Sequence, residues 1–595
     1  MAFGTTRNAP SPEPKGALST SPSPSPSRDI AHNGRNYLGL RGAKLGWAIT
    51  SVATIGFLLF GYDQGVMSGI ITGEYFNKEF PATYGSDQHA STIQGTVTSV
   101  YELGCFGGAL TALFLGERMG RLRTICLGAV IMILGTVIQV TAFDAHFGLG
   151  QFIIGRVVTG VGNGFNTATI PTWQAECSTG ASRGMLVCIE AAMIAVGTFI
   201  AYWFDFGLSF VPSHVQWRLP IAFQIVFAIG LIAGVCVLPE SPRWLLAHGH
   251  EDEGTRVIAF LRGEAIDSEP VLREKRNILA GIARVQSEGH CKNRDLLTGG
   301  KTQHLRRTLL GASSQVFQQL GGCNAVIYYC PVLFENSVHL DRTLSLVLGG
   351  VLATVYALST LASFTLVEKL GRRPMFLIGS FGQMVAMIIT FACLIPGSVS
   401  ASKGAAFGLY LYIIFFGSTW LELPWLYPAE INPLRTRTKA NAISTSANWI
   451  FNFMVVQVVP TMVASIGWGT YLFFAVMNAL FIPVIYFYYP ETKGRSLEEI
   501  DLLFAKGYLN GGGMEYVTVS KTMPRLTEHE VERQIAEIEG VEKVEGAGGV
   551  DNGREDVENA RGRQGSEPTL LNEVRADRGE DVNDPATTFN PIKGG

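Results

Sequence analysis

The stretch that decides the fold is "GERMGR" (Gly116–Arg121), because a close copy, "VEKLGRR" (Val367–Arg373), follows 251 residues later. A second motif, "PESPR" (Pro239–Arg243), returns as "PETKGR" (Pro490–Arg495) at the same offset. Repeated motifs in the same order indicate two homologous halves. Parallel halves related by an axis along the membrane normal are typical of transporters whose binding site lies between the halves.

A third repeat lies between those motifs and completes a set of acids and arginines at predicted cytoplasmic helix ends. Glu176 and Arg183 recur as Glu430 and Arg437 with the same internal spacing. We expect this set to cap helix ends and also to clasp the cytoplasmic ends of the halves while the cavity faces outward, without touching substrate. The predicted cytoplasmic-gate residues are Glu117, Arg121, Glu176, Arg183, Glu240, Arg243, Glu368, Arg372, Glu430 and Arg437.

Composition places the chain in a membrane. Of 595 residues, 47% are hydrophobic and 16% charged, against roughly 25% charged in soluble domains. The mean hydropathy is +0.24. The formal net charge of −3, with no basic face, excludes a nucleic-acid partner. Nine scattered cysteines form neither a metal-ligand spacing nor a disulfide framework, so we expect no metal.

Apolar runs of about 20 residues, the length that a membrane-spanning helix needs, occur twelve times. They begin near Leu45, Thr92, Arg123, Gly148, Met185, Leu219, Thr308, Leu344, Pro374, Ala405, Asn441 and Thr470. The predicted fold is therefore an all-α membrane protein with twelve transmembrane helices in two six-helix pseudo-symmetric halves.

Charge and polarity divide the chain into five segments. Arginines and lysines concentrate in the loops after spans 2, 8 and 10, so both termini and the central insert are predicted to be cytoplasmic. The insert reads as short amphipathic helices, and the chain from Leu509 onward as disordered, with at most a short helix around "TEHEVERQIAEIEG". The predicted segments are an N-terminal tail (1–43), the first half (44–239), a linker (240–307), the second half (308–490) and a mostly disordered tail (491–595).

One carboxylate, Asp63, stands inside the apolar run "FLLFGYDQGVMSGI", where insertion scales assign it a cost of roughly 2.5–3.5 kcal/mol. The arginine well inside a span is Arg156, in "GQFIIGRVVTGVGNGF". Both lie about eight residues from the outer ends of their spans, roughly 12 Å deep. We therefore predict an Asp63–Arg156 ion pair. It is either a proton switch, in which protonation of Asp63 releases the arginine, or a static buried pair.

Three further acids lie within predicted spans. Glu102 is a candidate third member of the Asp63–Arg156 group, because spans 1, 2 and 4 share one half. For Glu190 and Glu422 we favour hydrogen bonds to neighbouring backbone or water over a role in transport.

Amides gather in spans 7 and 11. "VFQQLGGCNAVIYY" contains Gln318, Gln319 and Asn324, and "STSANWIFNF" contains Asn448, Trp449 and Asn452. Amides beside aromatic faces suit neutral hydroxylated ligands, since they supply paired donors and acceptors.

Together, "GERMGR", "EKLGRR", "PESPRW", "PETKGRSLEEID", "FQQLGGCNAVIYY" and "LPWLYPAE" resemble the sugar porters of the major facilitator superfamily, over roughly residues 44–507. "SVYELGCFGG" and "GTFIAYWFDFGLSF" more closely resemble fungal glycerol/proton symporters of that family. The resemblance implies that Asp63 and Arg156 couple the proton. It also implies a set of residues that line the substrate cavity: Gln318, Gln319, Asn324, Trp425, Asn448 and Trp449.

The chain departs from hexose carriers of this family at several positions. Ala191 and Thr198 replace span-5 glutamines, and Tyr356 replaces a span-8 asparagine. We expect Tyr356 to narrow the substrate site. "LELPW" replaces the common Gly-Pro pair of span 10, so the sequence gives no basis for the gating bend that the family has there.

The leading hypothesis is a proton-coupled symporter in the plasma membrane that imports a small neutral polyol, glycerol first, by alternating access. The alternative is a monosaccharide (hexose or pentose)/proton symporter. A transporter-like nutrient sensor, suggested by the long polar tail, is the alternative from another class. An enzyme is not expected, because no catalytic triad, metal spacing or phosphate-binding loop is present. The proton and the lipid bilayer are the expected partners besides substrate, with no cofactor and no required oligomer.

Overall fold

A computed structural model of the chain describes residues 37–85, 87–143, 147–178, 183–287, 293–336, 340–433, 435–527 and six positions between 530 and 538. It separates into two compact units, Met1–Pro524 and Arg525–Gly595. In the second unit the described positions from 530 to 538 are helical, and the rest of the short helix predicted around 527–540 lies outside the described residues. All other observations below concern the first unit.

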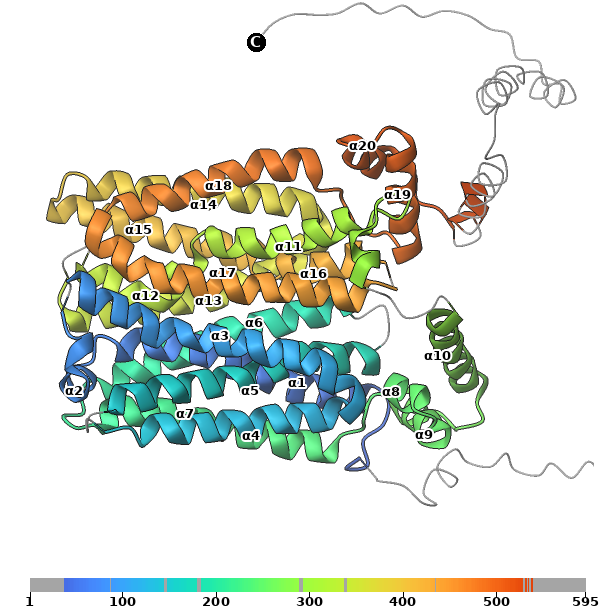
Figure 1. The fold of residues 1–595 in the computed structure, drawn as a ribbon, viewed down its shortest axis with the longest axis horizontal. Helices are drawn as coiled ribbons and strands as arrows, with labels where there is room; N and C mark the ends of the chain where they lie inside the picture. The colour runs from blue at the N-terminus through green and yellow to red at the C-terminus, as the bar shows by residue number, and fades with distance from the viewer. Residues whose placement is uncertain are drawn as a thin grey trace, which may run out of the picture. The chain divides into compact units, whose positions relative to one another are not determined.

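The first half consists of six long helices, which lie together in Figure 1. They are α1 (Ala43–Ile70), α3 (Gln88–Met119), α4 (Arg121–Val140), α5 (Gly148–Cys177), α6 (Arg183–Leu208) and α7 (Val215–Val237). Two short elements, α2 (Glu74–Glu79) and η2 (Pro81–Thr83), follow α1 on the outer side.

The second half lies beside the first and repeats its order with two interrupted spans (Figure 1). Its elements are α11 (His304–Leu320) with α12 (Cys323–Asn336), α13 (Arg342–Leu370), α14 (Arg372–Leu394), α15 (Val399–Phe415) with η5 (Phe416–Trp420) and α16 (Leu423–Ile431), α17 (Arg437–Ile466) and α18 (Gly469–Tyr488). The twelve predicted spans are confirmed, each beginning within six residues of its predicted start.

Hydropathy and length alone identify ten of these spans among the described residues. The helix α5 falls outside that set because it carries Arg156, Asn163, Asn166 and Gln174 on its buried side. The first span of the second half falls outside it because the chain breaks between α11 and α12. Polar residues in α5 and the break between α11 and α12 therefore hide these two spans from a search by hydropathy and length.

The tenth span does break, contrary to the expectation from its sequence. A π-helical segment, η5, ends at Trp420, and α16 begins anew with Pro424 in its first turn. Proline has no backbone N–H to donate and is tolerated at a helix start. The Gly-Pro pair of the family is absent here, and Pro424 interrupts the α-helical hydrogen bonds of this span instead.

The linker and the segment after the last span form short helices. The linker contains α8 (Pro242–Ala247), α9 (Glu251–Arg262), α10 (Glu269–Ser287) and η4 (Asn293–Leu297). After the last span come α19 (Leu497–Leu509) and α20 (Glu515–Thr522). Tyr516, Val517 and Val519 of α20 are buried, and the Arg306 guanidinium lies 4.0 Å from the Tyr516 ring centroid. The expectation of disorder from Leu509 onward is therefore wrong for α20.

The two halves are in contact at their outer ends. The Ser99 hydroxyl of α3 donates to the Gln457 side chain of α17 at 2.7 Å. The Trp203 indole of α6 donates to Thr354 of α13 at 3.1 Å. At Gly95 of α3 an added Cβ would lie 2.4 Å from the Gln457 carbonyl oxygen. These contacts hold the halves together at the ends predicted to face outward.

Candidate functional site

Asp63 and Arg156 form the predicted ion pair in the interior of the first half. The distance from Arg156 Nη1 to Asp63 Oδ1 is 2.9 Å, and both side chains are fully buried. Gln224 of α7 donates to the same oxygen at 2.9 Å. The guanidinium also lies 4.6 Å from the Tyr101 ring centroid. One oxygen of the carboxylate, Oδ2, has no hydrogen-bond partner among the described residues.

Glu102 lies near this pair but bonds elsewhere. It is fully buried on α3, and its Oε1 accepts a hydrogen bond from the Tyr328 hydroxyl of α12, in the other half. Its Oε2 has no hydrogen bond among the described residues. Glu102 therefore spans the interface between the halves, which its position in the sequence did not show.

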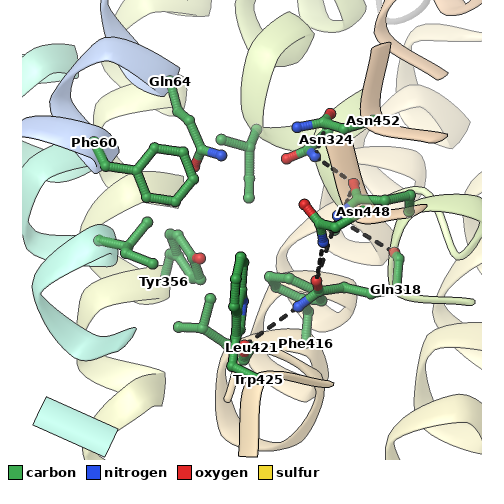
Figure 2. Close-up of a pocket in the computed structure, with 14 residues that line it drawn as sticks. Phe60, Gln64, Gln318, Asn324, Tyr356, Phe416, Leu421, Trp425, Asn448 and Asn452 are labelled. Atoms are coloured by element: carbon green, nitrogen blue, oxygen red, sulfur yellow. Dashed lines mark hydrogen bonds between the residues drawn. The ribbon is translucent and has the colours of Figure 1, made fainter. Parts of the chain in front are cut away.

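A small cavity of about 30 Å³ lies between the halves, well below the roughly 300–1,000 Å³ of typical small-molecule sites. Five predicted residues of the second half line it, together with Tyr356 (Figure 2). They are Gln318, Gln319, Asn324, Trp425 and Asn448. The first half contributes three residues to the lining, Phe60, Gln64 and Ile194.

The second-half amides form a network among themselves (Figure 2). Gln318 donates to the carbonyls of Trp420 and Leu421, at 2.8 and 3.2 Å, where the tenth span is broken. Its oxygen accepts from Asn448 at 3.1 Å. Asn324 donates to Asn452 at 2.6 Å. Most N–H groups of this network are therefore already used within the protein.

Gln64 is the lining amide that the sequence analysis missed. It lies on α1, one residue after Asp63, and its side chain faces the cavity opposite Asn324 (Figure 2). Among the described residues its amide takes no part in the second-half network, so it is available to a ligand. Its one available signal was the polar side chain adjacent to Asp63 in an apolar run.

The predicted lining residue Trp449 does not line the cavity, and neither do the span-5 residues Ala191 and Thr198. Trp449 is fully buried behind the cavity, where its ring packs against Phe60 with centroids 5.5 Å apart. Thr198 points toward α1 and donates to the Gly61 carbonyl at 3.0 Å. Ala191 is buried and does not contact the cavity. The substitutions at Ala191 and Thr198 therefore change helix packing in this conformation rather than the lining.

Other intramembrane acids are buried in distinct surroundings. Glu422 accepts a hydrogen bond from the Ser363 side chain of α13, whereas the sequence favoured neighbouring backbone or water as its partner. Glu190 is buried on α6. Asp205, near the outer end of α6, was missed by the sequence analysis. It is 5% exposed, and neither carboxylate oxygen has a side-chain partner among the described residues.

The repeated Glu/Arg motifs build the same structure in both halves. In the first half, Arg121 forms two hydrogen bonds to Glu176, both 3.0 Å long. The Glu240 carboxylate accepts the backbone N–H groups of Arg121 and Leu122 at 3.0 and 3.1 Å. Burial raises the pKa of the Glu240 carboxyl, and these N–H groups oppose that rise. Glu240 thus caps the start of α4.

The second half reproduces this cap. Arg372 donates to Glu430 at 2.7 Å, and the Glu491 carboxylate accepts the N–H groups of Arg372 and Arg373, each at 3.0 Å. Glu491 is the counterpart of Glu240 in "PETKGR", and it was missing from the predicted gate set. The repeat therefore preserves individual hydrogen bonds as well as sequence.

The remaining gate candidates make fewer contacts. Glu368 lies 3.8 Å from Arg372, and Arg437 donates to the Asn432 carbonyl at 3.1 Å. Glu117 and Arg243 have exposed side chains. The side chain of Arg183 lies outside the described residues. The two strong ion pairs, Arg121–Glu176 and Arg372–Glu430, each join helices within one half, so in this conformation they do not clasp the halves together.

Comparison with known proteins agrees with this geometry. Residues 49–504 match the family model described as "Sugar (and other) transporter". The chain is 51% identical to Sugar transporter STL1 of Saccharomyces cerevisiae over 500 residues, covering 84% of this chain and 87% of the relative. It is 31% identical to High-affinity glucose transporter 1 of Candida albicans over 477 residues, covering 76% of this chain and 84% of the relative.

A solved structure also matches. The proton:xylose symporter XylE bound to 6-bromo-6-deoxy-D-glucose aligns with a TM-score of 0.67 at 25% identity, covering 78% of this chain and 100% of that chain. This match confirms the predicted all-helical fold.

Proposed function

We propose, from the premise that this chain belongs to the sugar transporter family of the major facilitator superfamily, that it imports glycerol together with a proton. The chain is a transporter and not an enzyme. The proposed location is the plasma membrane, with both termini cytoplasmic.

The main support for proton coupling is the fully buried Asp63–Arg156 ion pair. A buried carboxylate is stable here because an arginine neutralises it at 2.9 Å. When Asp63 binds a proton, that attraction is lost, and Arg156 is free to seek other partners. The likeness to a proton:xylose symporter supports the same chemistry.

The state of the cavity supports a small polyol. Each desolvated hydroxyl left without a partner costs about 1–3 kcal/mol, and a pyranose has five hydroxyls. Because the second-half amides mostly bond to one another, a hexose would have to break that network to be satisfied. Glycerol has three hydroxyls, which Gln64, Tyr356 and the free oxygens of the amides can pair. Tyr356 also fills space that a sugar ring would need.

The deciding experiment is uptake of labelled glycerol into proteoliposomes with and without an inward proton gradient, with excess glucose as competitor. We expect accumulation that a protonophore abolishes and that glucose inhibits poorly. Asp63→Asn should lose accumulation and keep downhill exchange, whereas the control Glu253→Gln, an exposed acid on α9, should behave as wild type. Accumulation without a proton gradient would refute the proposal.

The same assay separates the alternatives. A clear preference for glucose would replace the glycerol proposal with a monosaccharide/proton symporter. Binding without sustained flux would favour a nutrient sensor.

A further inference from the structure

Glu102 occupies a place between the proton site and the substrate cavity. Its closest donor, the Tyr328 hydroxyl, comes from α12 in the second half. The Asn452 side chain of α17 also interacts with this carboxyl, and Asn452 lines the cavity and accepts from Asn324 at 2.6 Å. On the other side, Glu102 lies within electrostatic range of Arg156 and Asp63. One carboxyl therefore accepts a hydrogen bond from the second half and interacts electrostatically with the Asp63–Arg156 pair.

The charges around Glu102 do not balance if every acid is ionised. The titratable groups that face it come from its own helix and from α1, α5 and α12. They are Asp63, Tyr101, Cys105, Arg156, Cys323, Tyr328 and Tyr329. Arg156 is the cation of this group, and Asp63 already neutralises it at 2.9 Å. A second buried carboxylate without a cation is costly. Charge balance in this buried group therefore favours one protonated carboxyl over two carboxylates.

We propose that Glu102 is a second proton-binding carboxyl. Through Tyr328 and Asn452 it links the charge state of the Asp63–Arg156 pair to the substrate cavity and to the contacts between the two halves. This inference rests on the proposed proton-coupled transport.

The linkage follows from which half supplies each partner. Tyr328 and Asn452 belong to the second half, whereas Arg156 and Asp63 share the first half with Glu102. When the ends of the halves separate there, Glu102 loses the hydrogen bond from Tyr328 and becomes open to water. A proton from that water converts the carboxylate to a neutral acid, which can return to the dry interface when the halves close. Release of the same proton to inner water completes the cycle.

The test measures proton coupling in three variants in proteoliposomes loaded with labelled glycerol. Glu102→Gln keeps the shape of the side chain but cannot be charged. We expect it to retain downhill exchange, to lose the pH dependence of that exchange, and to lower the accumulation ratio at least fivefold. Tyr328→Phe should shift the pH profile of exchange, because Tyr328 is a positioning residue for Glu102. Tyr329→Phe, the neighbouring control whose hydroxyl donates to the Val456 carbonyl, should leave the pH profile in place.

The outcomes distinguish a failure of this inference from a failure of the proposed proton-coupled transport. One outcome is that the wild type accumulates glycerol with the gradient and that Glu102→Gln has the same pH profile and accumulation as the wild type. This outcome overturns the role of Glu102 and leaves the symporter proposal standing. Wild-type accumulation that survives a protonophore overturns both. If Glu102→Gln does not reach the membrane, Tyr328→Phe decides, and a wild-type pH profile in that variant overturns the inference.

Discussion

Two glutamines that face the same cavity should respond differently to replacement by alanine. Gln64 has an amide that the second-half network leaves free, whereas Gln318 is bonded to two carbonyls at the break in the tenth span. Loss of Gln64 should remove about one hydrogen bond to substrate. At about 0.5–1.5 kcal/mol, that lowers glycerol affinity roughly 2- to 13-fold.

Loss of Gln318 should act on the protein itself. Gln318→Ala leaves the Trp420 and Leu421 carbonyls without the donors that they have now. It also removes one of the two acceptors of Asn448 and leaves Gln315 as the other. Each buried group left unpaired costs about 1–3 kcal/mol. The two carbonyls alone predict a loss of about 2–6 kcal/mol in folding stability.

Both effects can be measured on purified protein in nanodiscs. Glycerol binding by calorimetry gives the affinity, and the thermal unfolding midpoint reports the stability of each variant. We expect Gln64→Ala to weaken binding at an unchanged midpoint and Gln318→Ala to lower the midpoint by several degrees. Equal midpoints for Gln318→Ala and wild type, or unchanged affinity for Gln64→Ala, would refute this assignment.

Three other predictions concern the cap, the cavity and the tail. Gly120→Ala should destabilise the protein by about 1–3 kcal/mol, because φ is 90° at Gly120 and an added Cβ would lie 2.7 Å from the Glu240 carboxylate. The control is Gly46→Ala, whose added Cβ meets nothing within 4 Å. Equal unfolding midpoints for the two variants would contradict the role of Glu240 as a cap. Tyr356→Asn should strengthen glucose competition against glycerol uptake by roughly 2- to 13-fold, the value of one added hydrogen bond, and unchanged competition would show that the tyrosine does not limit size. Truncation after Leu509 should lower the unfolding midpoint, because it removes the buried side chains of α20, whereas truncation after Pro524 should not; identical midpoints would contradict docking of α20.

The repeats and the hydropathy pattern were sufficient for the architecture. Membrane spans are local in sequence, since each must satisfy its own backbone hydrogen bonds in lipid, so twelve apolar runs predicted twelve helices. The Asp63–Arg156 pair was predictable for a related reason. An isolated charge in a span needs a partner, and depth along a helix can be counted from its end at 1.5 Å per residue.

Sequence determined depth and topology, but only the tertiary structure decided which way each side chain faces. The register of a helix about its own axis is set by its neighbours, so equal depth could not place Trp449 behind the cavity or turn Thr198 toward α1. For the same reason Gln64 was missed, although it adjoins Asp63. The hydrogen bond from Tyr328 to Glu102 joins residues 226 positions apart, and such a contact between the halves exists only once both have folded and met.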